Sequence, residues 1–323
     1  MGYPLIAPLR LRLGNYRDLR DTVTPSDRAQ TSENRGPPTF AGHCLGSTPG
    51  SNDQRRGAMS NEMENAVEAA WAYEGLHVDA LFRQWAEPVL DAAGVAAGSH
   101  VLDVACGTGV VAREAFARVG SSGAVTGLDI GAGMLAVAQS IEPGVDWVEG
   151  DAAELPFGAD EFDAVVSQFG LMFFPDRVGA IREMLRCAKP GSRVVVAVWD
   201  SLERSAAYPI SVDLLNRRAG PAAADALRAP FVLGDTHELR GLFELAGASA
   251  VSITTQKGTA RFPSVRSMVE ADLRGWLPVM GVSLDDDLVE LILNETEEAL
   301  STYVTEGGEM VFEAPAHIVT AQP

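Results

Sequence analysis

A strand that runs directly into a glycine-rich turn is the feature that most constrains this chain. Residues 101–109 read Val-Leu-Asp-Val-Ala-Cys-Gly-Thr-Gly, and the apolar residues after them recur with helical spacing. Glycine suits such a turn because a Cβ would obstruct both the bend and the approach of a ligand. A strand, turn and helix in this order present backbone N–H groups at the edge of an α/β sheet. The sequence therefore predicts a nucleotide-like ligand at this turn.

Strand-like and helix-like patterns alternate on either side of the turn. Short apolar runs predict five strands, at 101–105, 124–128, 146–149, 162–167 and 193–199. Helical spacing of apolar residues separates most of them, at 110–119, 133–140 and 177–188. Such alternation predicts a parallel, doubly wound α/β sheet. A chain of 323 residues, 46% of them hydrophobic, is long enough to bury its core.

The regular alternation ends after Trp199. Helical patterns follow at 201–233, 236–246, 265–276 and 285–304, with strand-like alternation at 251–255 and 310–320. We predict that 310–320 forms one strand. The sequence Lys189-Pro190-Gly191 is predicted as a turn before the strand at 193–199.

The first 58 residues differ in composition from the rest. They contain many prolines and polar residues without periodicity, which favours a disordered extension at 1–58 ahead of a domain at 59–323. A transit peptide should lack acidic residues, yet five interrupt this segment. N-myristoylation would need Ser or Thr where Ile6 stands. A further interpretation is that the translation start is placed too far upstream and that the working protein begins near Met59.

Charge and cysteine content indicate the class of protein. The formal net charge is −19, and the acidic excess lies after residue 58, because the first 58 residues hold eight arginines against five acids. A body of this charge repels a phosphate backbone, so we expect no nucleic-acid partner. No run approaches the roughly 20 apolar residues of a membrane span. Three scattered cysteines favour neither disulfides nor zinc, and we expect a cytoplasmic protein. Nothing in the sequence indicates an oligomeric state.

Three aspartates narrow the choice of ligand at the turn. Asp129 lies 20 residues beyond Gly109, and this spacing alone would suit NAD. However, Asp103 precedes the glycines by four residues, where its carboxylate would repel a pyrophosphate, and Asp151 follows the third predicted strand. Acids at three successive strand ends favour a cationic, amine-rich ligand that carries a ribose.

With these motifs together, the chain resembles the class I S-adenosylmethionine (SAM)-dependent methyltransferases, of the small-molecule type 11 or UbiE-like group. The resemblance covers about Leu90 to Trp199, and its motifs occur in family order: LDVACGTG, GLDIGAGML, GDAAELPF, FDAVVSQFGLMFF and KPGSRVVVAVW. It implies a Rossmann-like, mostly parallel seven-stranded sheet with helical lid insertions. It also implies SAM as the cofactor and a small-molecule substrate.

The resemblance assigns the methionine part of SAM to the glycine turn. Ala105, Gly107 and Gly109 would line it, and Asp103 would lie near its amino group. Cys106 between them looks reactive in isolation, but a small apolar filler is the better interpretation.

The resemblance assigns the nucleoside part to the next two strand ends. Asp129 would bind the ribose hydroxyls, although an aspartate there can also simply cap the next helix. Ile130 and Met134 would pack on the adenine, with a plain core role as the alternative for Met134. Asp151 would receive the adenine amine, assisted by the backbone of Ala152.

The remaining assignments concern the methyl group. Gln168 and Phe169 would lie near the sulfonium and the substrate entrance. An aromatic helix closing over the cofactor would include Tyr73, although packing on the sheet explains an aromatic stripe equally well. If the acceptor must lose a proton, His77 on this lid is the candidate general base, with a surface histidine as the alternative.

The sequence thus predicts transfer of a methyl group by in-line displacement to an O, N or C nucleophile of an organic molecule. We expect lid helices at 59–90 and substrate-cap insertions at 201–233 and 264–305, whose aromatic and apolar residues indicate an apolar pocket. Two other classes of function stay open. An NAD-dependent oxidoreductase would need a proton-relay group such as a Tyr-x-x-x-Lys pair, which this sequence lacks. A non-catalytic SAM-binding regulator would share every cofactor motif.

Overall fold

The computed structural model describes residues 50–323, and from Ala66 onward they form one compact unit. Helix α1 (Gly50–Tyr73) starts nine residues before the predicted domain start at 59, so residues 50–58 belong to this helix. No proline interrupts this stretch, which allows the helix to extend toward the N-terminus. The remainder of the predicted extension, residues 1–49, lies outside the described residues.

A seven-stranded sheet has the order β3-β2-β1-β4-β5-β9-β6. Its strands are β1 (His100–Val104), β2 (Ala124–Asp129), β3 (Asp146–Glu149), β4 (Phe162–Gln168), β5 (Ala188–Trp199), β6 (Ser249–Gln256) and β9 (Ala316–Gln322). The first five pair in parallel, and β9 runs antiparallel to both β5 and β6. This confirms the predicted doubly wound, mostly parallel fold. The strand order reverses between β1 and β4, which is where such folds bind ligands.

Helices cover the sheet in the positions that the alternation predicts. They are α2 (Arg83–Ala93), α3 (Val110–Val119), α4 (Ala132–Ile141), α5 (Arg177–Cys187) and α8 (Thr236–Ala246), with a short η3 (Gly120–Ser122). Helices α2 and α3 pack on each other, and α5 packs on α8. Strand residues such as Leu102, Val165 and Val196 are fully buried, because strands covered on both faces are apolar throughout.

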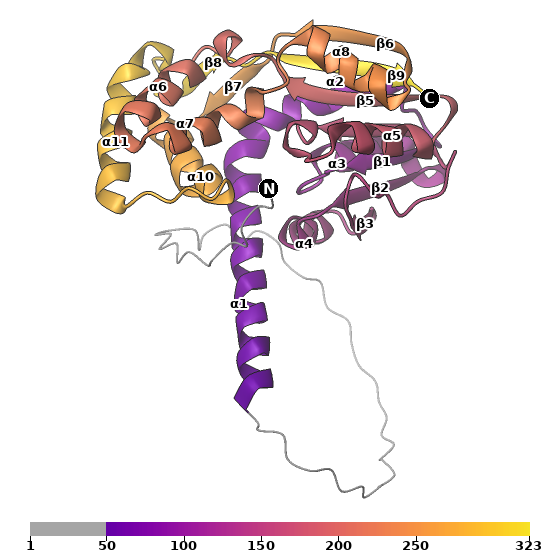
Figure 1. Ribbon diagram of the computed structural model, residues 1–323, viewed down its shortest axis with the longest axis horizontal. Helices are drawn as coiled ribbons and strands as arrows, with labels where there is room; N and C mark the ends of the chain where they lie inside the picture. Colours follow the sequence, from indigo (N-terminus) through magenta and orange to yellow (C-terminus); the bar gives the residue numbers. More distant parts are fainter. Residues whose placement is uncertain (1–49) are drawn as a thin grey trace, which may run out of the picture. The chain divides into compact units, whose positions relative to one another are not determined.

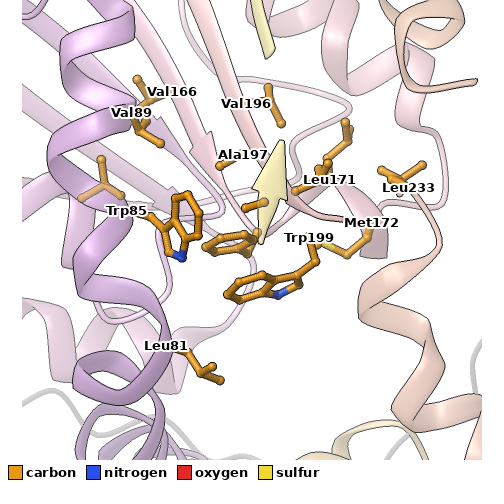
Figure 2. Packing of buried hydrophobic residues seen from close by; sticks show 14 of the residues in the cluster. Leu81, Trp85, Val89, Val166, Leu171, Met172, Val196, Ala197, Trp199 and Leu233 are labelled. Carbon is orange, nitrogen blue, oxygen red and sulfur yellow. The ribbon is translucent and has the colours of Figure 1, made fainter. Parts of the chain in front are cut away.

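Aromatic rings fill the core where β4 and β5 end. Trp85 of α2 and Trp199 of β5 point toward one another in Figure 2, with ring centroids 6.2 Å apart and an edge-to-face arrangement. Leu171 and Met172, in η4 (Leu171–Phe173), lie beside Trp199 in the same view. This part of the core therefore joins the sheet to the segments at its carboxyl edge.

Segments far apart in the sequence form one helical layer beside the sheet (Figure 1). Its elements from the first insertion are η5 (Leu202–Arg204), α6 (Tyr208–Ala219), α7 (Pro221–Arg228) and η6 (Ala229–Phe231). Those from the second are α9 (Val265–Glu270), η7 (Ala271–Trp276), α10 (Leu277–Val279), α11 (Asp286–Ala299) and η8 (Ser301–Tyr303). Helix α11 packs on α6 and α9, and the Trp276 indole donates to the Ala226 carbonyl at 2.8 Å. We call this layer the cap.

Two predictions about strands are wrong. Residues 310–320 form two strands rather than one: β8 (Met310–Glu313) pairs with β7 (Thr259–Phe262) in a separate sheet, and β9 joins the main sheet. Pro315 lies at the break, where it cannot donate to a ladder. Strand β5 begins at Ala188, so Lys189-Pro190-Gly191 is a bulge within it, and Lys189 pairs with Asp163 at 2.6 Å.

The structure also bears on the membrane prediction. Within residues 50–323, no helix is both long and apolar enough to cross a bilayer.

Candidate functional site

The turn after β1 is held by a carboxylate from the neighbouring strand. Gly107 and Gly109 have φ values of 57° and 87°, which residues with a side chain rarely adopt. At the end of β2, Asp129 accepts hydrogen bonds from the Gly107 N–H and from the Gly131 N–H, each at 2.8 Å. Because a carboxylate offers about four acceptor positions, Asp129 keeps capacity for a further donor. Asp129 thus anchors the glycine turn, and its binding of ribose hydroxyls stays a prediction.

Asp103 has a structural role that its place in the sequence does not indicate. Its carboxylate is buried and accepts the Ala112 N–H at 3.0 Å, which satisfies an N–H in the first turn of α3. Burial raises the pKa of Asp103 to about 8, with a smaller contribution from Asp129. A contact with the amino group of SAM stays a prediction. Beside it, burial raises the pKa of the Cys106 thiol, as expected for a filler.

An aromatic stack lies over the glycine turn. It comes from the end of α1 and from the π-helix η2 (Glu74–Phe82). The Tyr73 ring lies 5.6 Å from His77 and 5.5 Å from Phe82, between centroids. A Cβ built on Gly107 would lie 3.9 Å from the Tyr73 hydroxyl. Burial, with Asp129 and other acidic groups, raises the pKa of Tyr73. The structure therefore places Tyr73 close to Gly107 and Asp129, and its role as a lid over a cofactor stays a prediction.

His77 lies within this stack rather than at the surface. Burial lowers the pKa of His77 to about 4, so its imidazole is neutral at pH 7. Its Nδ1 is buried and has no hydrogen-bond partner. A neutral ring with an open nitrogen can accept a hydrogen bond, but so low a pKa makes it a weak general base at pH 7.

The end of β4 meets the end of β1. Ala105 and Phe169 both have positive φ, 58° and 56°, and such strained backbone clusters at functional sites. The Phe169 ring stacks on Trp199 with centroids 3.9 Å apart. Gln168 donates to the Phe82 carbonyl at 3.1 Å, while its Oε1 is buried without a partner. Gln168 and Phe169 thus border the aromatic stack.

The predicted adenine contacts lie at the ends of β2 and β3. Ile130 is 73% exposed, and Met134 lies half-buried against the turn at Gly131. Asp151 is exposed, and its carboxylate accepts the Ala153 N–H of its own turn at 2.8 Å. Ala152 beside it is buried. The Gly150 N–H donates to the Asp129 carbonyl at 3.0 Å, which ties the two strand ends together.

Two features of the site have no signal in the sequence. Glu74 pairs with Arg113 at 2.8 Å, and Arg113 Nε also donates to the Gly109 carbonyl at 3.2 Å. This links the lid to the glycine turn. In addition, the Trp147 indole occupies the space that a Cβ on Gly109 or Gly127 would need. No local pattern predicts such contacts, because the partners lie far apart in the sequence.

Unpartnered polar atoms gather at this edge of the sheet. The buried atoms without a hydrogen-bond partner include Glu74 Oε2, His77 Nδ1, Thr108 Oγ1, Ser167 Oγ and Gln168 Oε1. Buried polar groups are nearly always hydrogen-bonded, so this group needs an explanation. A ligand with ammonium, hydroxyl and amine donors fits the oxygen atoms, and Gly107, where a Cβ would meet only the Tyr73 ring at 3.9 Å, leaves room for it. The residues present are thus compatible with SAM.

The buried acids predict how stability depends on pH. Burial raises the pKa of Asp103 and of Asp272 in the cap to about 8, so between pH 6.5 and 8 the folded protein holds protons that the unfolded chain has released. We expect the free energy of unfolding of the ligand-free protein to fall over this range, by at most about 1.4 kcal/mol per pH unit and group. The lowered pKa of His77 affects the free energy of unfolding only below about pH 6.5, where the histidine of the unfolded chain becomes protonated. Urea titrations at several pH values measure the slope.

Matched variants separate this effect from others. Asp103→Asn and Asp272→Asn should each flatten the slope, whereas Asp213→Asn, at an exposed position of α6, should leave it unchanged. A wild-type stability that rises between pH 6.5 and 8 would contradict the prediction.

Comparison with known proteins places these residues in a family context. Residues 77–209 match the model of the ubiE/COQ5 methyltransferase family. The 2-phytyl-1,4-beta-naphthoquinone methyltransferase of Arabidopsis thaliana, a chloroplastic protein, is 40% identical over 131 residues, which are 38% of this chain and 50% of that protein. The demethylmenaquinone methyltransferase of Renibacterium salmoninarum is 44% identical over 115 residues, 36% and 47% of the two chains. The chain spans about half the length of these curated relatives.

A solved structure supports the fold. Phosphoethanolamine N-methyltransferase 2 of Haemonchus contortus, in complex with phosphomonomethylethanolamine and S-adenosylhomocysteine, aligns with a TM-score of 0.51 and 14% identity. The alignment covers 81% of this chain and 58% of that one, and it concerns the fold alone. Over residues 77–209 the chain is similar to the ubiE/COQ5 methyltransferase family, which confirms the resemblance to SAM-dependent methyltransferases that its motifs predict.

Proposed function

We propose that this protein binds SAM at the carboxyl ends of β1, β2 and β4 and methylates an organic small molecule. The observation that carries the proposal is Asp129, which holds the Gly107 N–H while keeping acceptor capacity for ribose hydroxyls. When bound, SAM supplies an electrophilic methyl group on a sulfonium.

The residues of the chain would bind and orient the two reactants. Ala105, Gly107 and Gly109 would line the methionine part, and Asp103 would bind its amino group. Asp129 would hold the ribose. Ile130, Met134, Asp151 and Ala152 would surround the adenine. These roles follow the order of the strand ends.

The lid would exclude water and align the acceptor. Tyr73 and Phe82 stack on each other beside the turn, and Phe82 packs directly on Phe169 and Trp199. This cluster of rings lowers the local dielectric, which favours a displacement that consumes a cation. Gln168 would fix the entrance through its bond to the Phe82 carbonyl. His77, neutral at pH 7, would accept a hydrogen bond from the acceptor rather than act as a strong base.

The identity of the acceptor is a separate matter. The names of the relatives describe methyltransferases of a naphthoquinone and of demethylmenaquinone. However, the family match ends at residue 209, before most of the cap. We therefore propose an apolar organic acceptor and do not carry the quinone over. The formal charge of −19 disfavours nucleic acid, and the free, buried thiols Cys106 and Cys187 favour a cytoplasmic location.

Calorimetry of the full chain with SAM and with NAD tests the cofactor. We expect SAM to bind at least about 100-fold more tightly than NAD, a difference of about 2.7 kcal/mol. Methyl-labelled SAM offered with a panel of metabolites then tests turnover. Tight NAD binding without SAM binding would refute the proposal. SAM binding without turnover of any acceptor would favour the non-catalytic regulator.

A further inference from the structure

The cap contains a buried carboxylate without an evident structural role. Asp272 is 6% exposed and lies on the π-helical η7. Its Oδ2 is fully enclosed and has no hydrogen-bond partner. An unsatisfied buried polar atom of this kind destabilises the fold, and more so if the group is charged. A binding partner for Asp272 would explain why the chain keeps it.

Aromatic rings surround this part of the cap. Tyr208, on the first turn of α6, lies close enough to Asp272 that the carboxylate contributes to raising the pKa of the phenol. The Tyr208 and Phe231 centroids are 5.2 Å apart. Trp276, one turn after Asp272, lies 5.1 Å from Phe173.

These rings also connect Asp272 to the cofactor edge. Phe173 belongs to η4, which follows the carboxyl end of β4, and η6 packs on both η4 and β5. The π-helix that carries Asp272 therefore contacts, through Trp276, the segment that follows the carboxyl end of β4.

Some polar groups of the cap are satisfied by backbone carbonyls. The Tyr303 hydroxyl donates to the Ala206 carbonyl at 2.7 Å, and the Trp276 indole is paired with Ala226. By contrast, the buried hydroxyls of Ser205 and Ser211 have no partner, and Ser211 lies three residues after Tyr208 on α6. The two unpartnered hydroxyls thus stand three residues before and three residues after Tyr208 in the sequence.

We propose that Asp272 hydrogen-bonds a hydroxyl of the methyl acceptor, an aromatic alcohol that binds among the rings of the cap, and so determines acceptor specificity. This inference rests on the proposed function. Burial raises the pKa of Asp272 to about 8, so at pH 7 the free group is a neutral acid that can both donate to and accept from a hydroxyl. A site built for a hydroxyl rejects an analogue that lacks the donor, because its own buried group is then left unpaired.

Two probes of similar shape test the inference: 2-naphthol, which has the hydroxyl, and 2-methoxynaphthalene, which lacks the donor. Calorimetry of the full chain, with and without S-adenosylhomocysteine, measures both affinities. We expect 2-naphthol to bind at least tenfold more tightly. Asp272→Leu should abolish the preference, and Asp272→Asn, which keeps the shape and one acceptor, should reduce it to about threefold. Exposed Asp213→Asn on the same cap should keep it in full.

Every outcome bears on Asp272. Equal affinities in the wild type, binding of neither probe, or a full preference in Asp272→Asn would overturn the proposal, and the Asn variant covers the case in which Asp272→Leu does not fold. SAM affinity, measured in the same preparations, tests the proposed function separately. A wild type that prefers 2-naphthol but binds no SAM would refute the methyltransferase proposal and leave the hydroxyl site standing.

Discussion

Asp129→Asn is expected to weaken SAM binding by about 30-fold, or about 2 kcal/mol. The Asp129 carboxylate accepts from two backbone N–H groups, at Gly107 and Gly131, both at 2.8 Å. The amide has one oxygen, so one of these donors would face an NH₂ group. The glycine turn would lose an anchor, and a ribose hydroxyl would lose its charged acceptor. Calorimetry with SAM measures the affinity, and urea unfolding measures the accompanying loss of stability.

Two other aspartates make this effect specific. Asp151→Asn should weaken SAM binding less than tenfold, because Asp151 is exposed and bonded only to its own turn. Asp146→Asn, at the exposed start of β3 and the opposite edge of the sheet, should leave the affinity unchanged. If Asp129→Asn bound SAM as tightly as the wild type, the ribose assignment would be wrong.

The parts of the site that are local in sequence could be predicted. A strand, two glycines and a helix fall within 20 residues, and the acid that holds them stands at the end of the next strand. Parallel strands bring their carboxyl ends to one edge, so Asp103, Asp129 and Asp151 are expected there. The structure gives one of them a further role, because the Asp103 carboxylate accepts the Ala112 N–H in the first turn of α3.

The parts that depend on distant contacts could not be predicted. Glu74 and Arg113 are 39 residues apart and meet only because the lid packs over the turn. Asp272 resembles one more acid on an exposed helix, yet it faces the interior of the cap. Alternation across 310–320 predicts one strand because apolar periodicity continues through Pro315, where the ladder breaks. Periodicity reports burial, and it does not report which element covers a residue.

The second large effect is expected at Gly109, where two constraints coincide. Its φ of 87° costs a residue with a Cβ about 1–2 kcal/mol. A Cβ would also overlap the Trp147 indole, and overpacking of this kind costs about 1–3 kcal/mol. We therefore expect Gly109→Ala to lower the free energy of unfolding by about 3 kcal/mol. Urea unfolding monitored by circular dichroism measures it.

Two other glycines separate the constraints. Gly247 is in the left-handed region with a φ of 95°, as Gly109 is, and no atom lies within 4 Å of the position that a Cβ would take, so Gly247→Ala should cost only the backbone term, about 1–2 kcal/mol. Gly127 lacks the positive φ but faces the same indole, so Gly127→Ala should show the overlap alone.

Trp147→Leu removes the obstacle and tests the cause directly. In that background, Gly109→Ala should cost about 1–2 kcal/mol less than in the wild type, since residues in contact couple by amounts of this size. The Gly247→Ala cost should not change, because no atom, and so no part of the indole, lies near the position of its Cβ. Equal costs for Gly109→Ala with and without Trp147 would mean that the backbone alone requires the glycine. A reduced cost would mean that the ring on β3 helps to set the shape of the turn that the proposed cofactor occupies.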